Sequence, residues 1–312
     1  MIANKYTVYS NAKVNLFFQI LNKFPDGYHN VHTLMQSVNL TDIIEFEFYP
    51  CQNFTVELNL TNNNGQFPLD NNNLIVKAIL AFIDLTKLVF NYKIKISVTK
   101  NIPIGAGLGG GSSNCAATLQ LFNKIVKNPL SYDKLIILAK ELGADVPFNL
   151  NGGLQFGHHL GDQLIDISNY FFDYHMVLLK PAKLDIQTAW AYAEFDKYDN
   201  NNLAKNIKRN SAYLKALDRN DYQRFYRYLK NSFEKVVFNT YPDLKELYQA
   251  ILKLNPDVAH LTGSGSCIYA IFTDKDRVDK FKDTINKSAK FPDLLIWPVQ
   301  PVKFGNNIIL VD

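Results

Sequence analysis

The sequence is poor in cysteine and has no long apolar run. Its three cysteines (Cys51, Cys115, Cys267) are an odd number, lie far apart and form no CxxC pair. A disulfide framework or a cysteine-ligated zinc site is therefore not expected, and this usage fits a reducing cytoplasm. No stretch approaches the roughly 18 uninterrupted apolar residues that a membrane helix needs, and the polar first ten residues lack the pattern of a signal peptide. We therefore expect a cytoplasmic protein with no membrane partner.

The sequence also lacks a block of charges of one sign. Lys and Arg number 33 against 29 Asp and Glu, so the net charge of +4 is small and spread along the chain. Nucleic-acid-binding proteins usually carry a basic patch or arm, so a nucleic-acid partner is not expected. A slight excess of cations is compatible with an anionic small-molecule substrate.

The composition is otherwise that of a folded protein, with 312 residues, 47% hydrophobic and 20% charged. It excludes a disordered, collagen-like or coiled-coil chain, and the length favours two domains. Period-two alternation predicts strands, and apolar stripes at helical spacing predict helices. In chain order these are strands at 42–49 and 54–60, a helix at 73–88, a strand at 92–99, helices at 113–126 and 132–142, strands at 152–156 and 176–180, helices between 188 and 254, a strand at 267–272 and a helix at 276–288. We expect an α+β protein with domains at residues 1–165 and 166–312.

The most informative segment is a glycine-rich loop between a predicted strand and a predicted helix. Five glycines in seven residues let the backbone approach a ligand closely, and the N–H groups at the start of the following helix attract anions. The two serines can add hydroxyl donors, and the second can cap the helix. We expect this loop to bind phosphate through Pro103, Ile104, Gly105, Ala106, Gly107, Leu108, Gly109, Gly110, Gly111, Ser112 and Ser113.

Two common phosphate loops do not fit this string. A Walker A loop needs Lys and then Ser or Thr after its last glycine. Here Ser112 and Ser113 follow Gly111 directly, without a lysine. Gly105, Gly107 and Gly110 satisfy GxGxxG. A dinucleotide site, however, also needs a second parallel strand that ends in an acidic residue about 20 residues later. Another helix is predicted there, so the dinucleotide interpretation fails.

The loop resembles the ATP loop of the GHMP small-molecule kinases, the family of galactokinase, homoserine kinase and mevalonate kinase. Further segments resemble other stretches of the family in the same order along nearly the whole chain. They are Ala-Lys-Val-Asn-Leu at 12–16, Asp-Gly-Tyr-His at 26–29 with Thr-Leu at 33–34, Gly-Ala-Asp-Val-Pro-Phe at 143–148, Asn-Ser-Phe-Glu at 231–234 and Leu-Thr-Gly-Ser-Gly-Ser-Cys at 261–267.

This resemblance implies a fold, a donor and a catalytic pair. The fold would combine an N-terminal domain like ribosomal protein S5 domain 2 with a ferredoxin-like C-terminal domain. ATP would be the phosphate donor and Mg²⁺ would accompany it. Asp145 would be the base for the substrate hydroxyl, with Lys13 as its partner and Asn15 orienting the site. Without the resemblance, Asp145 reads as a turn cap on a loop held by Pro147, and Lys13 as an exposed strand lysine.

The segment at 26–29 implies the substrate, because it is typical of one member of the family. That member phosphorylates the 2-hydroxyl of a cytidine diphosphate-linked methylerythritol in the non-mevalonate route to isoprenoids. Tyr28 and His29 would hold the cytosine, since a ring can stack on a base and a peptide or imidazole can meet its polar edge. Thr188 and Tyr192 fall where the family contacts its substrate. Without the family, residues 26–29 read as a surface turn.

Other interpretations stay open at this point. The chain could act on homoserine, a sugar or a mevalonate derivative, or it could bind nucleotide without turnover, as a monomer or a homodimer. His29 and His32 form HxxH, but no third ligand is in sight and no metal-binding side chains are expected. Two departures concern loop shape: residues 157–162 differ from the family's Gly-x-Gly-Glu turn, and Ser232 replaces an Asp.

Overall fold

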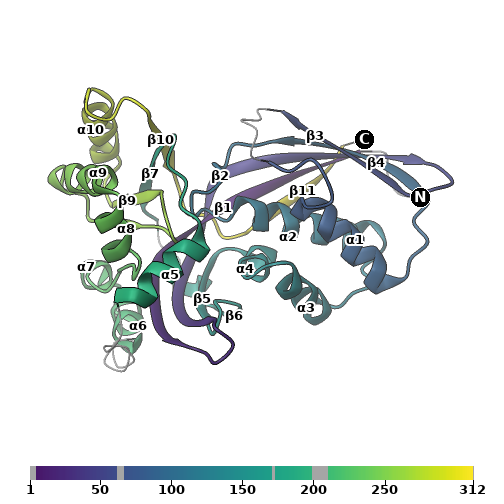
Figure 1. Ribbon diagram of the computed structural model, residues 1–312, viewed down its shortest axis with the longest axis horizontal. Helices are drawn as coiled ribbons and strands as arrows, with labels where there is room; N and C mark the ends of the chain where they lie inside the picture. The colour runs from purple at the N-terminus through teal and green to yellow at the C-terminus, as the bar shows by residue number, and fades with distance from the viewer. Residues whose placement is uncertain (1–4, 62–66, 171–172, 199–209, 312) are drawn as a thin grey trace.

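A computed structural model describes residues 5–61, 67–170, 173–198 and 210–311, and contains two sheets with helices packed against them (Figure 1). The first sheet has the order β11-β1-β2-β4-β3, and β5 pairs with both β2 and β6. Its strands are β1 (Lys5–Lys23), β2 (His29–Pro50), β3 (Thr55–Thr61), β4 (Tyr92–Thr99), β5 (Leu154–His158), β6 (Gln163–Asp166) and β11 (Asn306–Val311).

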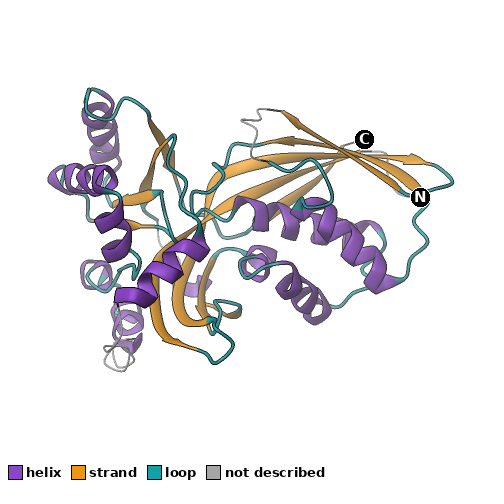
Figure 2. Cartoon of the chain, viewed as in Figure 1, coloured by secondary structure: helices purple, strands orange, loops and turns teal. Residues whose placement is uncertain are grey.

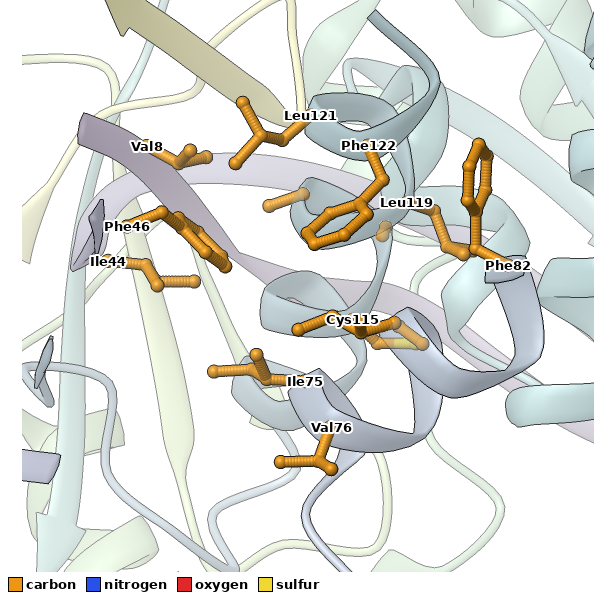
Figure 3. Close-up of a cluster of buried hydrophobic side chains, with 14 of the residues drawn as sticks. Val8, Ile44, Phe46, Ile75, Val76, Phe82, Cys115, Leu119, Leu121 and Phe122 are labelled. Atoms are coloured by element: carbon orange, nitrogen blue, oxygen red, sulfur yellow. The ribbon is translucent and has the colours of Figure 1, made fainter. Parts of the chain in front are cut away.

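Helices cover one face of the first sheet, as Figure 2 shows. They are α1 (Leu74–Thr86), α2 (Gly110–Ile125), α3 (Tyr132–Leu142) and α4 (Val146–Asn151). The core between the two layers is rich in aromatic rings: Phe46, Phe82 and Phe122 are almost fully buried there (Figure 3). Each such ring contributes roughly 1.5–3 kcal/mol by leaving water, so this core holds α2 firmly against the sheet.

The second sheet is antiparallel throughout, with the order β10-β7-β9-β8. Its strands are β7 (His175–Pro181), β8 (Val258–Leu261), β9 (Ile268–Phe272) and β10 (Leu294–Val299). The helices of this half are α5 (Thr188–Tyr198), α6 (Asn210–Asp218), α7 (Tyr222–Tyr226), α8 (Glu234–Thr240), α9 (Pro242–Lys253) and α10 (Lys275–Asn286). In the described part of the chain no helix is long and apolar enough to span a bilayer.

Two long strands connect the halves. β1 and β2 are 19 and 22 residues long. They run from the first sheet into a buried cluster that also contains side chains of β7 and β9 (Figure 1). Their pairing shifts register between Asn11 and Ala12 and again between Asn15 and Phe17. Such irregularities bend a strand and redirect its side chains, and Lys13 lies between these two.

The α+β, two-domain expectation is confirmed, and several element boundaries need correction. The helix expected at 113–126 begins at Gly110, with Gly109 as its N-cap, so Ser113 is inside the helix and does not cap it. Asp145 lies at the N-cap of α4 rather than on an irregular loop, because Pro147 is compatible with the first turn of a helix. The division near residue 165 stays a prediction, and residues 306–311 return to the first sheet beside β1.

Candidate active site

A cavity of about 580 Å³ lies between the two halves and collects most of the predicted site. The glycine-rich loop forms one wall, and β1 contributes Lys13, Asn15 and Phe18. The second half contributes side chains of α5, which lies where the halves meet (Figure 1), and the turn before β9. A cleft between two domains is a common place for a small-molecule site.

The glycine-rich loop needs glycine at defined positions. Gly105, Gly107 and Gly109 have φ values of +65°, +74° and +67°, in the region that side chains avoid. A Cβ on Gly107 would lie 2.4 Å from the carbonyl oxygen of Thr262, and one on Gly109 would lie 2.8 Å from Cγ of Lys13. The loop therefore packs tightly against both halves, and α2 starts directly after it.

The structure brings residues 103–112 to the cavity wall but not Ser113. The Ser113 side chain is fully buried, where its hydroxyl accepts a hydrogen bond from Ser10 (2.7 Å) and donates to the side-chain oxygen of Asn306 (3.3 Å). Ser112 lines the cavity. The loop can therefore offer the N–H groups at the start of α2 and one hydroxyl to an anion.

Lys13 and Asp145 meet at the end of this loop. The ammonium nitrogen lies 3.2 Å from Oδ2 of Asp145, although 132 positions separate the residues in the sequence. The lysine side chain is 5% exposed, whereas that of the aspartate is 39% exposed. The carboxylate therefore lies beside a buried cation and remains open to the cavity. This arrangement can accept a proton from a bound hydroxyl.

A hydrogen-bond network fixes the direction of the lysine. Its ammonium donates to Oδ1 of Asn15 (2.5 Å), and the Asn15 amide donates to the hydroxyl of Thr33 (2.8 Å). The backbone N–H of Asn15 donates to the hydroxyl of Thr262 (2.9 Å), in the turn from the second half. The Lys13 backbone N–H donates to the carbonyl of Leu108 in the loop (3.0 Å). The strand β1, the glycine-rich loop and the turn at residues 261–267 therefore meet at one site.

Lys100, which precedes the loop, is a second cation on the cavity wall. Its ammonium pairs with Asp42 and donates to Asn114 of α2 (3.2 Å). Asp42 is fully buried and also accepts from the N–H groups of Asn101 (2.8 Å) and Ile102 (2.9 Å). A buried charge supported by so many donors is rigid, so Lys100 is held in place beside the start of α2.

The predicted substrate residues divide into two groups. Thr188 and Tyr192 line the cavity, and the Thr188 hydroxyl is 3.0 Å from that of Ser264. Burial, together with the nearby charge of Asp145, raises the pKa of Tyr192 well above its usual value. Its hydroxyl is therefore a neutral donor at physiological pH.

His29 and Tyr28 lie farther out along the same side. The His29 ring stacks on Tyr192 with centroids 4.5 Å apart, and its Nε2 is 2.6 Å from Oδ1 of Asp196. Tyr28 is 63% exposed at the turn between β1 and β2. Neither residue lines the cavity itself, but Tyr192, which does, stacks on His29.

Sequence reasoning missed several of these contacts. Asp196, Thr33 and Thr262 were not assigned a role, because their partners lie 18 to 247 positions away in the chain. The turn at 261–267 was recognised as a motif, but its closeness to Gly107 follows only from the fold. The turn at residues 157–162, which departs from the family's pattern, also reaches the cavity, since Leu160 and Gly161 line it.

Residues 73–155 match the family model for the GHMP kinases N terminal domain, and residues 213–290 match the model for GHMP kinases C terminal. Curated relatives named 4-diphosphocytidyl-2-C-methyl-D-erythritol kinase extend the similarity to nearly the whole chain. The protein of Prochlorococcus marinus is 35% identical over 96% of each chain. That of Caldanaerobacter subterraneus subsp. tengcongensis is 32% identical over 88% of this chain and 90% of its own.

Solved structures show the same architecture. A crystal structure titled 4-(cytidine 5'-diphospho)-2C-methyl-D-erythritol kinase matches with a TM-score of 0.71 and 25% identity, over 95% of this chain and 98% of the other. Homoserine kinase from Cytophaga hutchinsonii matches with a TM-score of 0.76 but only 19% identity, over 99% and 98%. At 19% identity, the match to homoserine kinase shows only that the two proteins share a fold.

Proposed function

This chain belongs to the GHMP kinase family, and we propose that it transfers the γ-phosphoryl group of ATP to the 2-hydroxyl of 4-diphosphocytidyl-2-C-methyl-D-erythritol. The reaction yields ADP and the 2-phosphate, a step of the non-mevalonate isoprenoid pathway. The substrate follows from the names of the curated relatives and from residues 26–29.

The observation that carries the proposal is the pairing of Lys13 with Asp145 at 3.2 Å beside the glycine-rich loop. Phosphoryl transfer depends mainly on positioning, charge neutralisation and removal of the hydroxyl proton. Asp145 takes that proton while the hydroxyl oxygen forms its bond to the γ-phosphorus and ADP leaves. Lys13 neutralises the negative charge that develops on the oxygen.

ATP binds with its phosphates along residues 103–112, where the start of α2 presents its N–H groups. Lys100 supplies a further positive charge on the same wall. Mg²⁺ bound to nucleotide phosphates needs only one or two protein oxygens, and the described residues contain no cluster of three metal-binding side chains. Ser112 provides a hydroxyl at the cavity wall, and Mg²⁺ there would neutralise phosphate charge.

The cytidine part of the substrate extends from the cavity past Tyr192 to His29 and Tyr28. The rings of Tyr192 and His29 are stacked, and Tyr28, the residue before His29, is exposed. A pyrimidine stacks well on aromatic rings of this kind. Asp196 holds Nε2 of His29 and so fixes the orientation of the imidazole. Thr188 is on the cavity wall, 3.0 Å from the hydroxyl of Ser264, where it can contact the substrate.

The enzyme is proposed to act as a monomer or a homodimer. The proposed domains, residues 1–165 and 166–312, each contribute to the cavity. All three cysteines are free thiols, which agrees with the proposed cytoplasmic location.

An acceptor comparison tests the function. The purified protein is supplied with Mg²⁺ and ATP and, in separate reactions, with 4-diphosphocytidyl-2-C-methyl-D-erythritol, homoserine, galactose and mevalonate. We expect ADP release with the first acceptor at a kcat/KM at least 100-fold above the others, and ³¹P NMR of the product should place the new phosphate on the 2-oxygen. Preference for another acceptor would reassign the protein within the family. ATP binding without turnover on any acceptor would leave a nucleotide-binding protein.

A further inference from the structure

The turn between β5 and β6, residues 159–162, lies against the tip of the hairpin formed by β1 and β2, residues 24–28. His159 of the turn contacts Phe24 of the tip, with ring centroids 5.0 Å apart. The turn also forms part of the wall of the main cavity. It therefore contacts both the proposed active site and the segment that carries a proposed cytidine-binding residue.

His159 has a backbone conformation that few side chains adopt. Its φ is +62°, in the left-handed region that residues other than glycine rarely occupy. Counted back from Gly161 and Asp162, the first glycine of the family's Gly-x-Gly-Glu turn falls on this position. Glycine would fit here without strain, and a strained residue persists where the surrounding contacts hold it. The contacts of the His159 side chain therefore need an explanation.

One of these contacts fixes the imidazole within the turn. Nδ1 of His159 lies 3.1 Å from Oδ1 of Asp162, and a carboxylate can only accept, so Nδ1–H donates. Asp162 also pairs with Lys140 of α3 (3.1 Å) and accepts from the backbone N–H of Leu160 (3.3 Å). A carboxylate held by several donors is a rigid acceptor. The imidazole ring therefore keeps one orientation.

The second contact is the packing of this ring on Phe24. The planes of the two rings meet at 41°, and aromatic pairs at this separation attract each other. Phe24 is the first residue of the hairpin tip. Its backbone N–H donates to the carbonyl of Tyr28 (2.7 Å), and its carbonyl accepts from the N–H of Gly27 (3.0 Å). The position of Phe24 therefore affects the position of Tyr28 directly.

The backbone of His159 holds the chain on the other side of the same residues. Its carbonyl accepts a hydrogen bond from the N–H of Val31 (2.7 Å), and Val31 lines the main cavity. Phe24 precedes Tyr28 and His29 in the sequence, and Val31 follows them. His159 thus contacts the chain before and after the two proposed cytidine residues.

The hairpin tip has few other supports. Asp196 of α5 holds its base, at Lys23 (2.5 Å) and at His29 (2.6 Å). Residues 25–28 are exposed. Among the described residues, the ring contact with His159 is the only hydrogen bond, ion pair or ring contact that joins residues 24–28 to another segment. Loss of this contact would leave the tip free to move beyond its base.

We propose that His159 is a positioning residue for the nucleoside end of the substrate. Its ring packs on Phe24 and so sets the direction in which the tip presents Tyr28 to the pyrimidine. A tip that is already ordered loses less conformational entropy when the substrate binds. The inference rests on the proposed function, which places a cytidine at Tyr28 and His29. Histidine in place of the family's glycine is then a specific adaptation of this chain to hold the tip.

Calorimetric titration of cytidine diphosphate tests the inference. The protein is first saturated with a non-hydrolysable ATP analogue, so that the glycine-rich loop is occupied. His159→Gly keeps the backbone conformation and removes the ring, and it should weaken binding by about threefold to tenfold, the scale of one aromatic contact. Phe24→Leu should have a similar effect, and the double variant should bind no more weakly than either single variant, because both changes remove the same contact.

Two results of this titration have different meanings. If His159→Gly binds cytidine diphosphate as tightly as the original protein, His159 does not position the tip and the inference is wrong. If the original protein itself binds no cytidine diphosphate, the proposed substrate is wrong, and the inference that depends on it is overturned as well.

Steady-state kinetics separates positioning of the nucleoside end from a general effect on the fold. His159→Gly should raise KM for 4-diphosphocytidyl-2-C-methyl-D-erythritol by the same factor, while kcat and KM for ATP change by less than about twofold. Asn128→Gly is the matched control, since Asn128 is exposed, has a φ of +56° and lies outside the cavity. It should change none of these values. An equal loss of ATP affinity or of kcat in His159→Gly would show that the turn supports the whole cavity, and it would overturn the inference.

Discussion

Lys13 and Asp145 form an ion pair in which the lysine side chain is 5% exposed and the aspartate side chain 39% exposed. The lysine is held on the inner side by Asn15, and the aspartate faces the cavity at the start of α4. A buried cation that loses its carboxylate partner is costly, whereas the carboxylate can still be solvated without the lysine. The two residues therefore have separate tasks. In the proposed mechanism Lys13 sets the local charge, and Asp145 does the proton chemistry.

Asp145→Asn should lower kcat by about 10²- to 10⁴-fold, the usual contribution of a general base, while the affinity for ATP changes little. An amide keeps the shape of the carboxylate but cannot take the hydroxyl proton. Steady-state kinetics and calorimetric ATP binding would separate these effects. Asp133→Asn, on the first turn of α3 and outside the cavity, is the control and should keep full activity. Full turnover in Asp145→Asn would refute its role as the base.

Among single residues, the sequence identifies site residues that stand in motifs, but it does not identify contact partners that come close only when the chain folds. Lys13, Asn15 and Asp145 stand in recognisable strings and were predicted to lie together, and they do. Asp196 stands in no motif, yet it is the partner of His29 from 167 positions away. Ser113 was expected at the nucleotide, but its hydroxyl faces Ser10 and Asn306 inside the protein.

The glycine-rich loop and the turn at 261–267 act together as structural elements. The loop comes from the first half and the turn from the second, and the backbone of Gly107 approaches that of Thr262 more closely than any side chain would permit. The same turn receives two hydrogen bonds from the Asn231 amide, at the carbonyls of Leu261 (2.7 Å) and Gly263 (2.8 Å). The cavity depends on this contact between halves.

Gly107→Ala should therefore impair nucleotide binding strongly. The new Cβ would lie 2.4 Å from a backbone oxygen at a φ of +74°, so either the loop or the turn must move. We expect ATP affinity to fall by at least about tenfold, since misplacement of the loop removes more than one phosphate contact. Gly111→Ala is the matched control in the same loop sequence, because its Cβ would meet only Leu74 at 3.4 Å. Equal ATP affinities in the two variants would contradict this account.

Elements with strong periodicity were predicted well from the sequence. β4 alternates buried and half-buried residues as expected, and α3 spans the predicted residues. The short strands β8 and β10 and the strand β11 were missed. β8 has only four residues, and β10 contains Pro298, which argues against a strand. β11 owes its place to pairing with β1, a contact that local sequence does not encode.

On the scale of the whole molecule, the strand β11 returns to the first sheet and pairs with β1. This pairing runs from Lys5 to Ser10, and β11 lies beside the helix layer formed by α2 and α4. Asn306 joins it to that layer: its amide donates to the carbonyl of Asn149 in α4 (2.7 Å) and to the side-chain oxygen of Gln120 in α2 (3.1 Å). β11 thus supports α2, whose first residues line the cavity, and α4, whose N-cap residue Asp145 lines it.

Asn306→Ala should reduce both stability and turnover although it lies outside the cavity. The change leaves the Asn149 carbonyl without its donor, at a cost of about 1–3 kcal/mol, and it loosens the helix that begins at Asp145. Thermal unfolding and kcat would measure the two effects. Asn307→Ala, at the exposed neighbouring position on β11, is the control. If Asn306→Ala matches Asn307→Ala in both measurements, β11 does not support the catalytic helices.

The return of β11 to the first sheet also bears on biosynthesis. While the chain emerges from the ribosome, α2 and α4 can form early, but the strand that braces them is translated about 150 residues after α4. In the first sheet, the edge of β1 stays unpaired until residues 306–311 have left the exit tunnel. We expect the nascent protein to complete its nucleotide site only after residues 306–311 have left the exit tunnel and paired with β1.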